Sequence, residues 1–552
     1  MTKVVLLAIN AKYVHSSLSV WVISEGIRSF ARFPYDVSVV EATIHQPVFD
    51  IAMRVAENKP DVVGISAYIW NAGMLPELLM ILRERLPNSP LVLGGPEASN
   101  NMNYWLETGA DYVLQGEGEY VFPQFLDAFT AGQGDRVTVF SVANSVLAAN
   151  ISSDKTVTLS PCPAVNPYTA QYLDSLNGRL AYIETSRGCP FKCSFCLSAG
   201  SGVRYFPLDV IKSHILTLSR SSTKTLKFVD RTFNCNPARA VEIFEFIITM
   251  ETTSRFHFEV AADLFDEKTL FVLEAAPPGR IQFEIGLQSF HKPALEATSR
   301  QTDIEKAARN IRTLMKMQNI HIHIDLIAGL PYETLDDFKD GFDRAYTLNT
   351  HNLQLGFLKL LHGSVLRTQA EDFGIKYSQN PPYEIISSPW LSTVDIQALK
   401  HTENALQHTR NKSRFLTALD YVLTVTGARP FDLLNSLGAA VPNHATQLED
   451  YIVQIYNFSL KQPGVEEAAL KDCLIYDWLG MVKGKNTPSF LKNDDTRQKS
   501  AGERKKAAET AERILGRKLR REEFAVLSSG KGIFADSNNR NPLTGLYKVF
   551  YC

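Results

Sequence analysis

The sequence lacks both a strong excess of charge and a long apolar run. Its 57 lysines and arginines nearly balance 59 aspartates and glutamates, so no global charge attracts nucleic acid or an anionic membrane. No run of about 18 apolar residues is present, which argues against a membrane-spanning helix. The opening residues 1–10 form a short apolar stretch with one lysine, a pattern that favours a buried strand over a signal peptide. We therefore expect a cytoplasmic protein with neither a membrane nor a nucleic acid as partner.

Cysteine is scarce and unevenly placed. The chain has seven cysteines, none of them in residues 1–161, and Cys162, Cys235, Cys473 and Cys552 are widely scattered. A disulfide framework would be denser and even in number, so the scattered four are typical of buried, unpaired thiols. The other three fall within one short segment, and such a group in a long chain that is expected to be cytoplasmic indicates metal binding.

Residues 1–135 alternate short apolar runs with segments of helical periodicity. This alternation predicts a flavodoxin-like or Rossmann-like parallel sheet covered on both faces, whose ligands bind at the carboxyl ends of the strands. The expected strands are Lys3–Ile9, Tyr35–Glu41, Asp61–Ser66, Pro90–Gly94 and Tyr112–Gln115. The expected helices are Ser17–Phe30, Val48–Asn58, Leu75–Leu86, Asn101–Gly109 and Tyr120–Ala131.

Three further segments complete an α/β multidomain fold. Residues 136–179 predict a linker with a small hairpin formed by Val146–Ile151 and Lys155–Leu159. Residues 180–362 return to β–α alternation with six units, which predicts a partial (β/α)6 barrel with its active site at the strand ends. Residues 363–552 predict a mostly helical domain.

The three clustered cysteines are Cys189, Cys193 and Cys196, in the pattern Cys-x3-Cys-x2-Cys. Thiolates suit iron–sulfur clusters, and three of them leave one iron of a four-iron cluster open to a substrate or cosubstrate. A structural zinc site is the alternative, but it would normally need a second cysteine pair, and no second Cys-x2-Cys occurs. The motif follows an expected strand, so we expect it in a loop at the carboxyl end of that strand.

The segment from Ser186 to Cys196, with the aromatic Phe195 before its last cysteine, resembles the cluster loop of the radical S-adenosylmethionine (SAM) superfamily. The resemblance implies a catalytic [4Fe–4S] cluster whose open iron binds SAM and whose reduction yields methionine and a 5′-deoxyadenosyl radical. A low-potential electron donor such as flavodoxin or ferredoxin is then implied. Later blocks, 228–233, 257–260, 284–289 and 325–334, resemble the branch that includes oxygen-independent coproporphyrinogen dehydrogenases and cobalamin-dependent radical enzymes.

The same resemblance implies a set of SAM contacts. A carboxylate can pair with the SAM ammonium, a planar guanidinium can hold its carboxylate, and a glycine lets the backbone approach adenine. The chain lacks the Gly-Gly-Glu triplet that many relatives carry after the second strand and has Asp230-Arg231-Thr232 there. The candidate SAM residues are Phe195, Asp230, Glu259, Gln288, Arg300, Asp325 and Gly329.

The N-terminal strand ends carry glycine-rich loops that allow a flat, bulky ligand to approach the backbone, although any flavodoxin-like sheet needs glycines at turns. Before a radical SAM barrel, these loops resemble the cobalamin-binding domain of class B radical enzymes. His15 is an alternative cobalt ligand, but it lacks the Asp-x-His-x-x-Gly context of mutase-type domains. Methylthiotransferases are disfavoured because residues 1–161 lack cysteine. The candidate cobalamin residues are Ser66, Gly94, Gly95, Gly116 and Glu117.

The resemblance implies a cobalamin-dependent radical SAM enzyme that transfers a methyl group to an unactivated carbon of an unknown substrate. One alternative is rearrangement, cyclisation or oxidation on the same scaffold. A second alternative, from another class, is a non-catalytic cobalamin or iron–sulfur sensor. The C-terminal residues 365–552 resemble an uncharacterised helical extension, which would cap the open end of a partial barrel.

Overall fold

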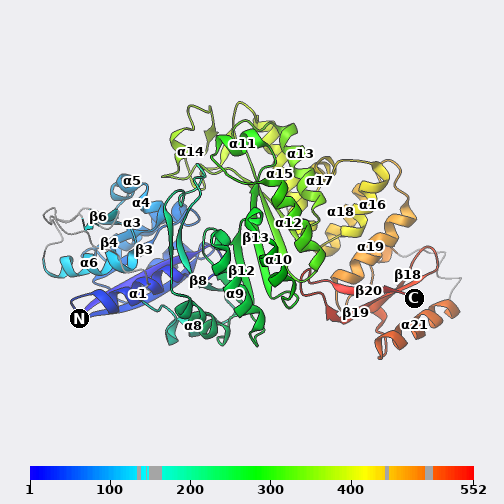
Figure 1. Ribbon diagram of the computed structural model, residues 1–552, viewed down its shortest axis with the longest axis horizontal. Helices are drawn as coiled ribbons and strands as arrows, with labels where there is room; N and C mark the ends of the chain where they lie inside the picture. Colours follow the sequence, from blue (N-terminus) through cyan, green and yellow to red (C-terminus); the bar gives the residue numbers. More distant parts are fainter. Residues whose placement is uncertain (133–138, 144–145, 148–164, 442–446, 492–500) are drawn as a thin grey trace. The chain divides into compact units, whose positions relative to one another are not determined.

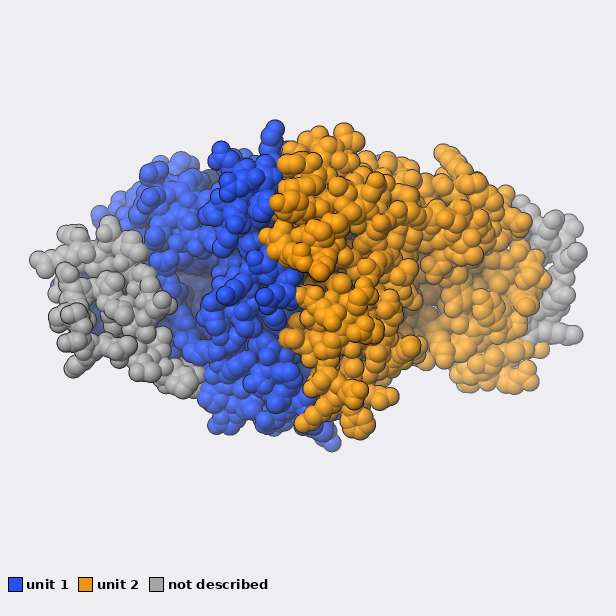
Figure 2. Space-filling model, turned by 45° about the horizontal axis from the view of Figure 1, so that its top comes forward, with its two compact units in different colours: residues 1–260, 298–301, 358–386 blue, residues 261–297, 302–357, 387–552 orange. Residues whose placement is uncertain are grey.

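The computed structural model describes residues 1–132, 139–143, 146–147, 165–441, 447–491 and 501–552. The chain divides into two compact units, coloured separately in Figure 2. The first unit comprises residues 1–260, 298–301 and 358–386, and the second comprises residues 261–297, 302–357 and 387–552. No helix in the described ranges is long and apolar enough to cross a bilayer.

The first unit begins with a seven-stranded sheet in the order β2-β1-β3-β4-β5-β6-β7. Its strands β3, β4 and β6 are labelled in Figure 1. Strands β1 to β6 pair in parallel, as the β–α alternation predicts, and β7 is antiparallel to β6. The strands are β1 (Thr2–Asn10), β2 (Tyr35–Thr43), β3 (Val62–Ser66), β4 (Leu91–Gly94), β5 (Tyr112–Gln115), β6 (Val139–Ala143) and β7 (Val146–Leu147). The helices are α1 (Leu18–Phe30), α2 (Val48–Glu57), η1 (Ala72–Met74), α3 (Leu75–Arg85), α4 (Pro96–Ser99), α5 (Met102–Glu107) and α6 (Gly118–Thr130).

The central strands of this sheet are buried on both faces. Residues 4–9 of β1 are at most 2% exposed, which explains the continuous apolar run in the sequence. Val146–Leu147, the start of the first expected hairpin arm, pairs with the preceding strand β6. The other expected arm, Lys155–Leu159, lies outside the described residues.

The rest of the first unit contains the cysteine segment and three parallel strands. Strand β11 (Thr225–Phe228) pairs with β8 (Ala181–Ile183) on one side and β12 (Arg255–Val260) on the other. Their buried face is aromatic: the rings of Phe228 and Phe258 stack at 4.2 Å. The remaining elements are α7 (Ala170–Ser175), β9 (Ser186–Cys189), β10 (Gly202–Tyr205), α8 (Leu208–Ser219), η3 (Phe233–Cys235), α9 (Pro237–Thr249), α14 (Val365–Thr368), β16 (Lys376–Tyr377) and β17 (Ile385–Ser387).

The second unit contains three more parallel strands, with β14 (His321–Ala328) between β13 (Ile281–Gln288) and β15 (Asn352–Phe357). Burial alternates strictly along β13 and β14, so one face packs apolar residues and the other carries half-buried polar ones. The helices associated with these strands are η4 (Ala262–Leu264), α10 (Glu267–Glu274), α11 (Lys292–Ala297), α12 (Ile304–Met317) and α13 (Leu335–Thr347).

The C-terminal part of the second unit is mostly helical, as expected, and ends in a three-stranded antiparallel sheet. Its helices are α15 (Thr393–His408), η5 (Arg410–Lys412), α16 (Leu416–Thr426), α17 (Pro430–Ala440), α18 (Leu448–Ser459), α19 (Glu467–Met481), η6 (Ser489–Leu491), α21 (Ala501–Leu515) and η7 (Arg521–Glu523). The strands are β18 (Phe524–Val526), β19 (Gly532–Arg540) and β20 (Tyr547–Tyr551).

Candidate functional site

The cysteine segment begins in a short hairpin, and the expectation that the whole motif lies in a loop is wrong for its first residues. Strand β9, which ends at Cys189, pairs antiparallel with β10. The turn to the motif requires glycine, because Gly188 has a φ of 99° and an added Cβ would lie 1.9 Å from the carbonyl oxygen of Gly202. The pairing fixes Cys189 while Cys193 and Cys196 follow in the loop.

The three thiols are close enough to influence one another electrostatically. Cys189 and Cys193 are 8% and 5% exposed. Burial raises the pKa of the Cys196 thiol, and the nearby Cys193 and Cys189 raise it further. Three thiolates gathered in this way are stabilised by a bound cationic centre.

The spacing of the thiols argues against a single zinc ion. Among the described residues, three potential ligand atoms lie within 4.8 Å of one another at Glu284, His323 and Asp325. The sulfurs of the three clustered cysteines do not form such a group. Zn–S bonds of about 2.3 Å in a tetrahedron would bring the sulfurs within about 4 Å of one another. More widely separated thiols fit a cluster in which each cysteine binds a different iron.

Two segments distant in sequence form hydrogen bonds with the segment from Cys189 to Cys196, the predicted cluster loop. The backbone N–H of Ser194 donates to the carbonyl oxygen of Thr298 at 2.9 Å, and Leu366 N–H donates to the carbonyl oxygen of Ser194 at 2.8 Å. Arg300 Nη1 lies 3.6 Å from the Sγ atom of Cys193. The guanidinium predicted to hold the SAM carboxylate therefore lies next to a cysteine predicted to bind the cluster.

Asp230 is buried beneath the cluster loop, with 1% exposure. Its carboxylate accepts hydrogen bonds from the backbone N–H of Thr185 at 3.1 Å, from Thr185 Oγ1 at 2.7 Å and from the hydroxyl of Ser186. Burial raises its pKa to about 6, although these hydrogen bonds oppose the shift. The carboxylate thus holds the residues that precede the cysteines.

Glu259 and Phe195 are more accessible. Glu259 lies at the end of β12 with its Oε1 atom 3.6 Å from the ammonium of Lys227, and its side chain is 34% exposed. The pairing shows that this carboxylate already accommodates an ammonium group. Phe195 is half-buried in the cluster loop.

A cavity of about 1180 Å³ opens at the carboxyl ends of the N-terminal strands. It exceeds the roughly 300–1,000 Å³ of ordinary small-molecule pockets, so it fits a large cofactor. Its wall also includes Gly188 and Glu259 from the radical SAM side of the first unit. All five residues predicted for cobalamin line it: Ser66, Gly94, Gly95, Gly116 and Glu117.

The glycines in this wall differ in what they allow. Gly95 has a φ of 102°, and an added Cβ would lie 2.7 Å from the carbonyl oxygen of Ala67. Gly94 would place a Cβ 3.7 Å from the carbonyl oxygen of Leu114 and near nothing else, so the space beyond it is open. The absence of a side chain at Gly94 therefore keeps the cavity wide, which is the property that a bulky corrin requires.

Two features of the cavity wall were missed from the sequence. Tyr68 and Trp70 stack with ring centroids 4.3 Å apart and present a flat apolar surface. Arg187 and Arg204 form ion pairs with Glu117 of the loop at residues 116–119, the Gly-Glu-Gly-Glu loop. The motif pattern gave no partner for either arginine, because the paired residues are far apart in the sequence.

His15, the alternative cobalt ligand, also lines the cavity. Its Nδ1 atom lies 2.6 Å from the hydroxyl of Tyr182. Burial lowers the pKa of His15, and the charges of Lys227, Lys12 and Arg179 lower it further, which favours the neutral imidazole. The structure thus gives this histidine a hydrogen-bonding partner across the cavity wall.

The second unit holds the other candidate SAM residues. Gln288 lies at a β-bulge with a φ of 69°, and its buried Oε1 atom has no hydrogen-bond partner among the described residues. A strained residue with an unsatisfied acceptor fits a ligand that supplies a donor, as SAM does through its amine and ribose hydroxyls. Gly329, which follows β14, has a φ of 100°.

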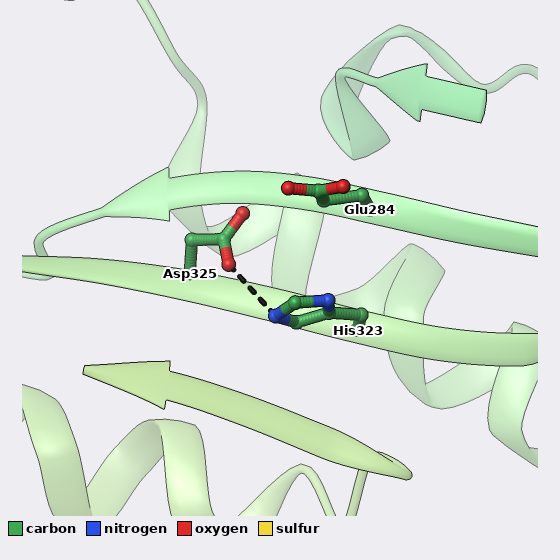
Figure 3. A group of neighbouring side chains, drawn as sticks. All are labelled: Glu284, His323 and Asp325. Carbon is green, nitrogen blue, oxygen red and sulfur yellow. Dashed lines mark ion pairs between the residues drawn. The ribbon is translucent and has the colours of Figure 1, made fainter. Parts of the chain in front are cut away.

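Asp325 belongs to a polar group on the half-buried face of β13 and β14 (Figure 3). Its Oδ1 atom lies 2.9 Å from Nε2 of His323, and Glu284 lies on the neighbouring strand. The imidazole of His323 therefore lies against the Asp325 carboxylate, which is the oxygen acceptor predicted for the ribose or amino-acid part of SAM.

Glu333 is a buried carboxyl in the loop after β14, with 1% exposure and a hydrogen bond from the Ser289 hydroxyl. Burial raises its pKa to about 8. Because the folded state retains a proton that the unfolded chain releases near pH 4.5, this group's stabilising contribution is full below about pH 4.5. It is lost as the pH rises through about 8.

We therefore expect the wild type to lose on the order of 3 kcal/mol of unfolding free energy between about pH 5 and pH 8 through this group. Glu333→Gln mimics the protonated acid and should remove that part of the dependence. Urea unfolding of the cluster-free protein at several pH values measures it, with the exposed Glu274→Gln as the control. Equal pH dependence in the wild type and Glu333→Gln would contradict the prediction.

Three family models match successive parts of the chain. The model described as "B12 binding domain" matches residues 4–126, and that described as "Radical SAM superfamily" matches residues 183–345. The model "Protein of unknown function (DUF4080)" matches residues 371–527. The radical SAM domain implies a [4Fe–4S] cluster and SAM, and the B12-binding domain implies cobalamin.

Among curated proteins, the chain is 25% identical over 354 residues to the cobalamin-dependent radical SAM methyltransferase TokK of Streptomyces tokunonensis, covering 60% of this chain and 51% of TokK. It is 24% identical over 331 residues to the anaerobic magnesium-protoporphyrin IX monomethyl ester cyclase of Rubrivivax gelatinosus, covering 57% of this chain and 59% of the cyclase. The chain thus spans between half and three fifths of the length of these relatives.

Two solved structures share the fold. TsrM of Kitasatospora setae, a radical SAM methyltransferase with cobalamin and a [4Fe–4S] cluster bound, aligns with a TM-score of 0.54 at 17% identity, covering 69% of this chain and 79% of TsrM. OxsB, with aqua-cobalamin bound, aligns with a TM-score of 0.58 at 13% identity, covering 86% of this chain and 78% of OxsB. The chain therefore joins a B12-binding domain to a radical SAM domain and is homologous to the cobalamin-dependent radical SAM methyltransferases, with a DUF4080 region after them.

Proposed function

We propose that the protein transfers a methyl group to an unactivated carbon of its substrate. The observation that carries the proposal is one cavity whose wall includes both the glycine loops of the B12-binding domain and the start of the cluster loop. In such an enzyme the reduced cluster and SAM supply a 5′-deoxyadenosyl radical, and cobalamin supplies the methyl group.

The residues of the chain have distinct proposed roles. Cys189, Cys193 and Cys196 hold the cluster. Glu259, whose side chain is 34% exposed, binds the SAM ammonium, and Arg300 binds the SAM carboxylate beside Cys193. The other proposed SAM contacts are Phe195, Gln288, Asp325 and Gly329, while Asp230 holds the start of the cluster loop in place.

The remaining assignments complete the proposal. Residues 1–135 bind cobalamin, residues 180–362 form the SAM barrel, residues 136–179 link the two, and residues 363–552 form a C-terminal domain that shapes the substrate pocket. Ser66, Gly94, Gly95, Gly116 and Glu117 would surround the corrin in the cavity that they line. The enzyme would work in the cytoplasm with a low-potential donor such as flavodoxin or ferredoxin.

The anaerobically reconstituted wild type, given dithionite and SAM, should release 5′-deoxyadenosine. With SAM labelled in its methyl group and an extract of the source cells as substrate pool, the label should appear in one product at a carbon position. A full cluster without 5′-deoxyadenosine would contradict the enzyme assignment. An unlabelled product formed together with 5′-deoxyadenosine would contradict methyl transfer.

Cyclisation or oxidation on the same scaffold is the second candidate, favoured by the similarity to the magnesium-protoporphyrin cyclase. It predicts a product that differs from substrate in hydrogen or oxygen content and carries no label. The sensor alternative predicts cofactor binding without turnover. The presence of a carboxylate and a guanidinium suited to SAM, Glu259 and Arg300, argues for the enzyme.

A further inference from the structure

The loop after β5 and the start of the cluster loop meet at one arginine. Arg187 lies two residues before Cys189, and its guanidinium donates to both carboxylate oxygens of Glu184, at 2.9 Å and 2.7 Å. Its Nη1 atom also lies 2.8 Å from Oε1 of Glu119 and 2.9 Å from Oε2 of Glu117. One side chain therefore joins β9, here called the cluster strand, to residues 116–119 of the B12-binding domain, here called the acidic loop.

The ion pairs of Arg187 form one network, in which each buried or half-buried charge is compensated by its partners. The Glu119 side chain is 6% exposed, and Glu117 is shared between Arg187 and Arg204 of β10. Removing one partner of such a group leaves an uncompensated charge away from water, which is costly. The planar fork of arginine matches two carboxylate oxygens at once, which an ammonium cannot do.

The two ends of the network belong to the two proposed cofactor sites. Gly116, Glu117 and Glu119 line the large cavity, and Arg187 precedes the first cluster cysteine. A bound cluster restrains residues 186–196 through three cysteines, and so restrains the Arg187 guanidinium. An ordered guanidinium in turn holds the loop 115–119 in the conformation that forms the cavity wall, which lowers the entropy cost of binding a ligand there.

Building on the proposed function, we propose that Arg187 is a positioning residue that couples cobalamin binding to assembly of the cluster. The cluster should tighten cobalamin binding, and cobalamin should tighten retention of the cluster by the same factor, because coupling between two binding equilibria is reciprocal. Glu119 transmits the coupling by fixing the acidic loop.

The test is the dissociation constant of hydroxocobalamin, measured by absorbance titration for full-length protein with and without its reconstituted cluster. We expect the cluster to lower the wild-type constant by about 5-fold or more. The ratio of the dissociation constant without the cluster to that with the cluster should fall to near one in Arg187→Gln and in Glu119→Gln. In Arg187→Lys this ratio should lie between one and the wild-type value. Glu119→Gln leaves the cluster strand and the Arg187–Glu184 fork intact, so it serves if Arg187→Gln fails to fold.

The matched control is Arg83→Gln, which removes the ion pair with Asp111 in the same domain, away from the cavity. It should keep the wild-type ratio. Hydrogen exchange gives a cobalamin-free measurement: reconstitution of the cluster should slow exchange of the amides at 115–119 in the wild type and not in Glu119→Gln.

Two results would overturn the coupling. One is a wild type that binds both cofactors with a ratio near one, which leaves the proposed function intact. The other is an unchanged ratio in both Arg187→Gln and Glu119→Gln. A wild type that retains its cluster but binds no hydroxocobalamin would instead overturn the proposed function and the coupling with it.

Discussion

A Cys193→Ala variant is expected to lose the iron–sulfur cluster and to release no 5′-deoxyadenosine above background. Cys193 is 5% exposed and has the Arg300 guanidinium beside its sulfur, so no water or neighbouring residue replaces it as a ligand. Iron content should fall from about four per chain to near zero. The loss should exceed the roughly 10–100-fold cost of removing a mere outer partner of a metal ligand. Iron assay, electron paramagnetic resonance and chromatography of the nucleoside measure it.

Cys473→Ala is the matched control for this variant. Cys473 is half-buried in α19, and burial raises the pKa of its thiol to about 12, which makes it a poor metal ligand. This variant should keep the cluster and the rate of 5′-deoxyadenosine release. Equal iron content in the two variants would exclude Cys193 as a cluster ligand.

A Gly94→Phe variant is expected to weaken cobalamin binding by about 100-fold or more, equal to about 2.8 kcal/mol. The backbone at Gly94 accepts a side chain, because its Cβ would contact one carbonyl oxygen at 3.7 Å. A phenyl ring placed there occupies space that the proposed corrin needs. Titration with hydroxocobalamin measures the loss, and cluster content should stay at the wild-type level.

Gly94→Ala separates the filling of the cavity from any effect on the backbone. A methyl group fits the open space, so its dissociation constant should stay within about 3-fold of the wild type. Gly95 is unsuitable for this comparison, since any side chain there would strain a left-handed backbone and meet Ala67. A Gly94→Phe variant that binds hydroxocobalamin with wild-type affinity would contradict the proposed location of the corrin beside Gly94.

The secondary structure was largely readable because periodicity is a local property. Five expected N-terminal strands match β1 to β5, with ends shifted by a few residues, and the six expected β–α units of the barrel correspond to the strands β8, β11, β12, β13, β14 and β15. Helix α17 lies in the region that is expected to be mostly helical, and Pro430 at its first position is a helix-start signal. The hairpin of β9 and β10 was missed because its pairing depends on Gly188 and Gly202, which are 14 residues apart in the sequence.

The sequence predicted which residues belong to the candidate site, but it did not predict which residues they contact. Asp230 was expected to face SAM, yet three donors from Thr185 and Ser186 surround its carboxylate. Glu117 was expected at the corrin, and it does line the cavity, but its oxygens also hold two arginines. Contacts between residues 45 or 68 positions apart leave no periodic trace in the sequence.

The sequence by itself determined the three-cysteine motif, the glycines at the strand ends and the order of the domains. Cysteine spacing, glycine positions and hydrophobic periodicity are each set by residues close together in the sequence, so they can be identified without a structure. Only the tertiary structure decided that the cysteine segment and the Gly-Glu-Gly-Glu loop share one cavity wall and are joined through Arg187. That meeting depends on how the parallel sheet packs against the first barrel strands, and packing brings together charges that the sequence keeps far apart.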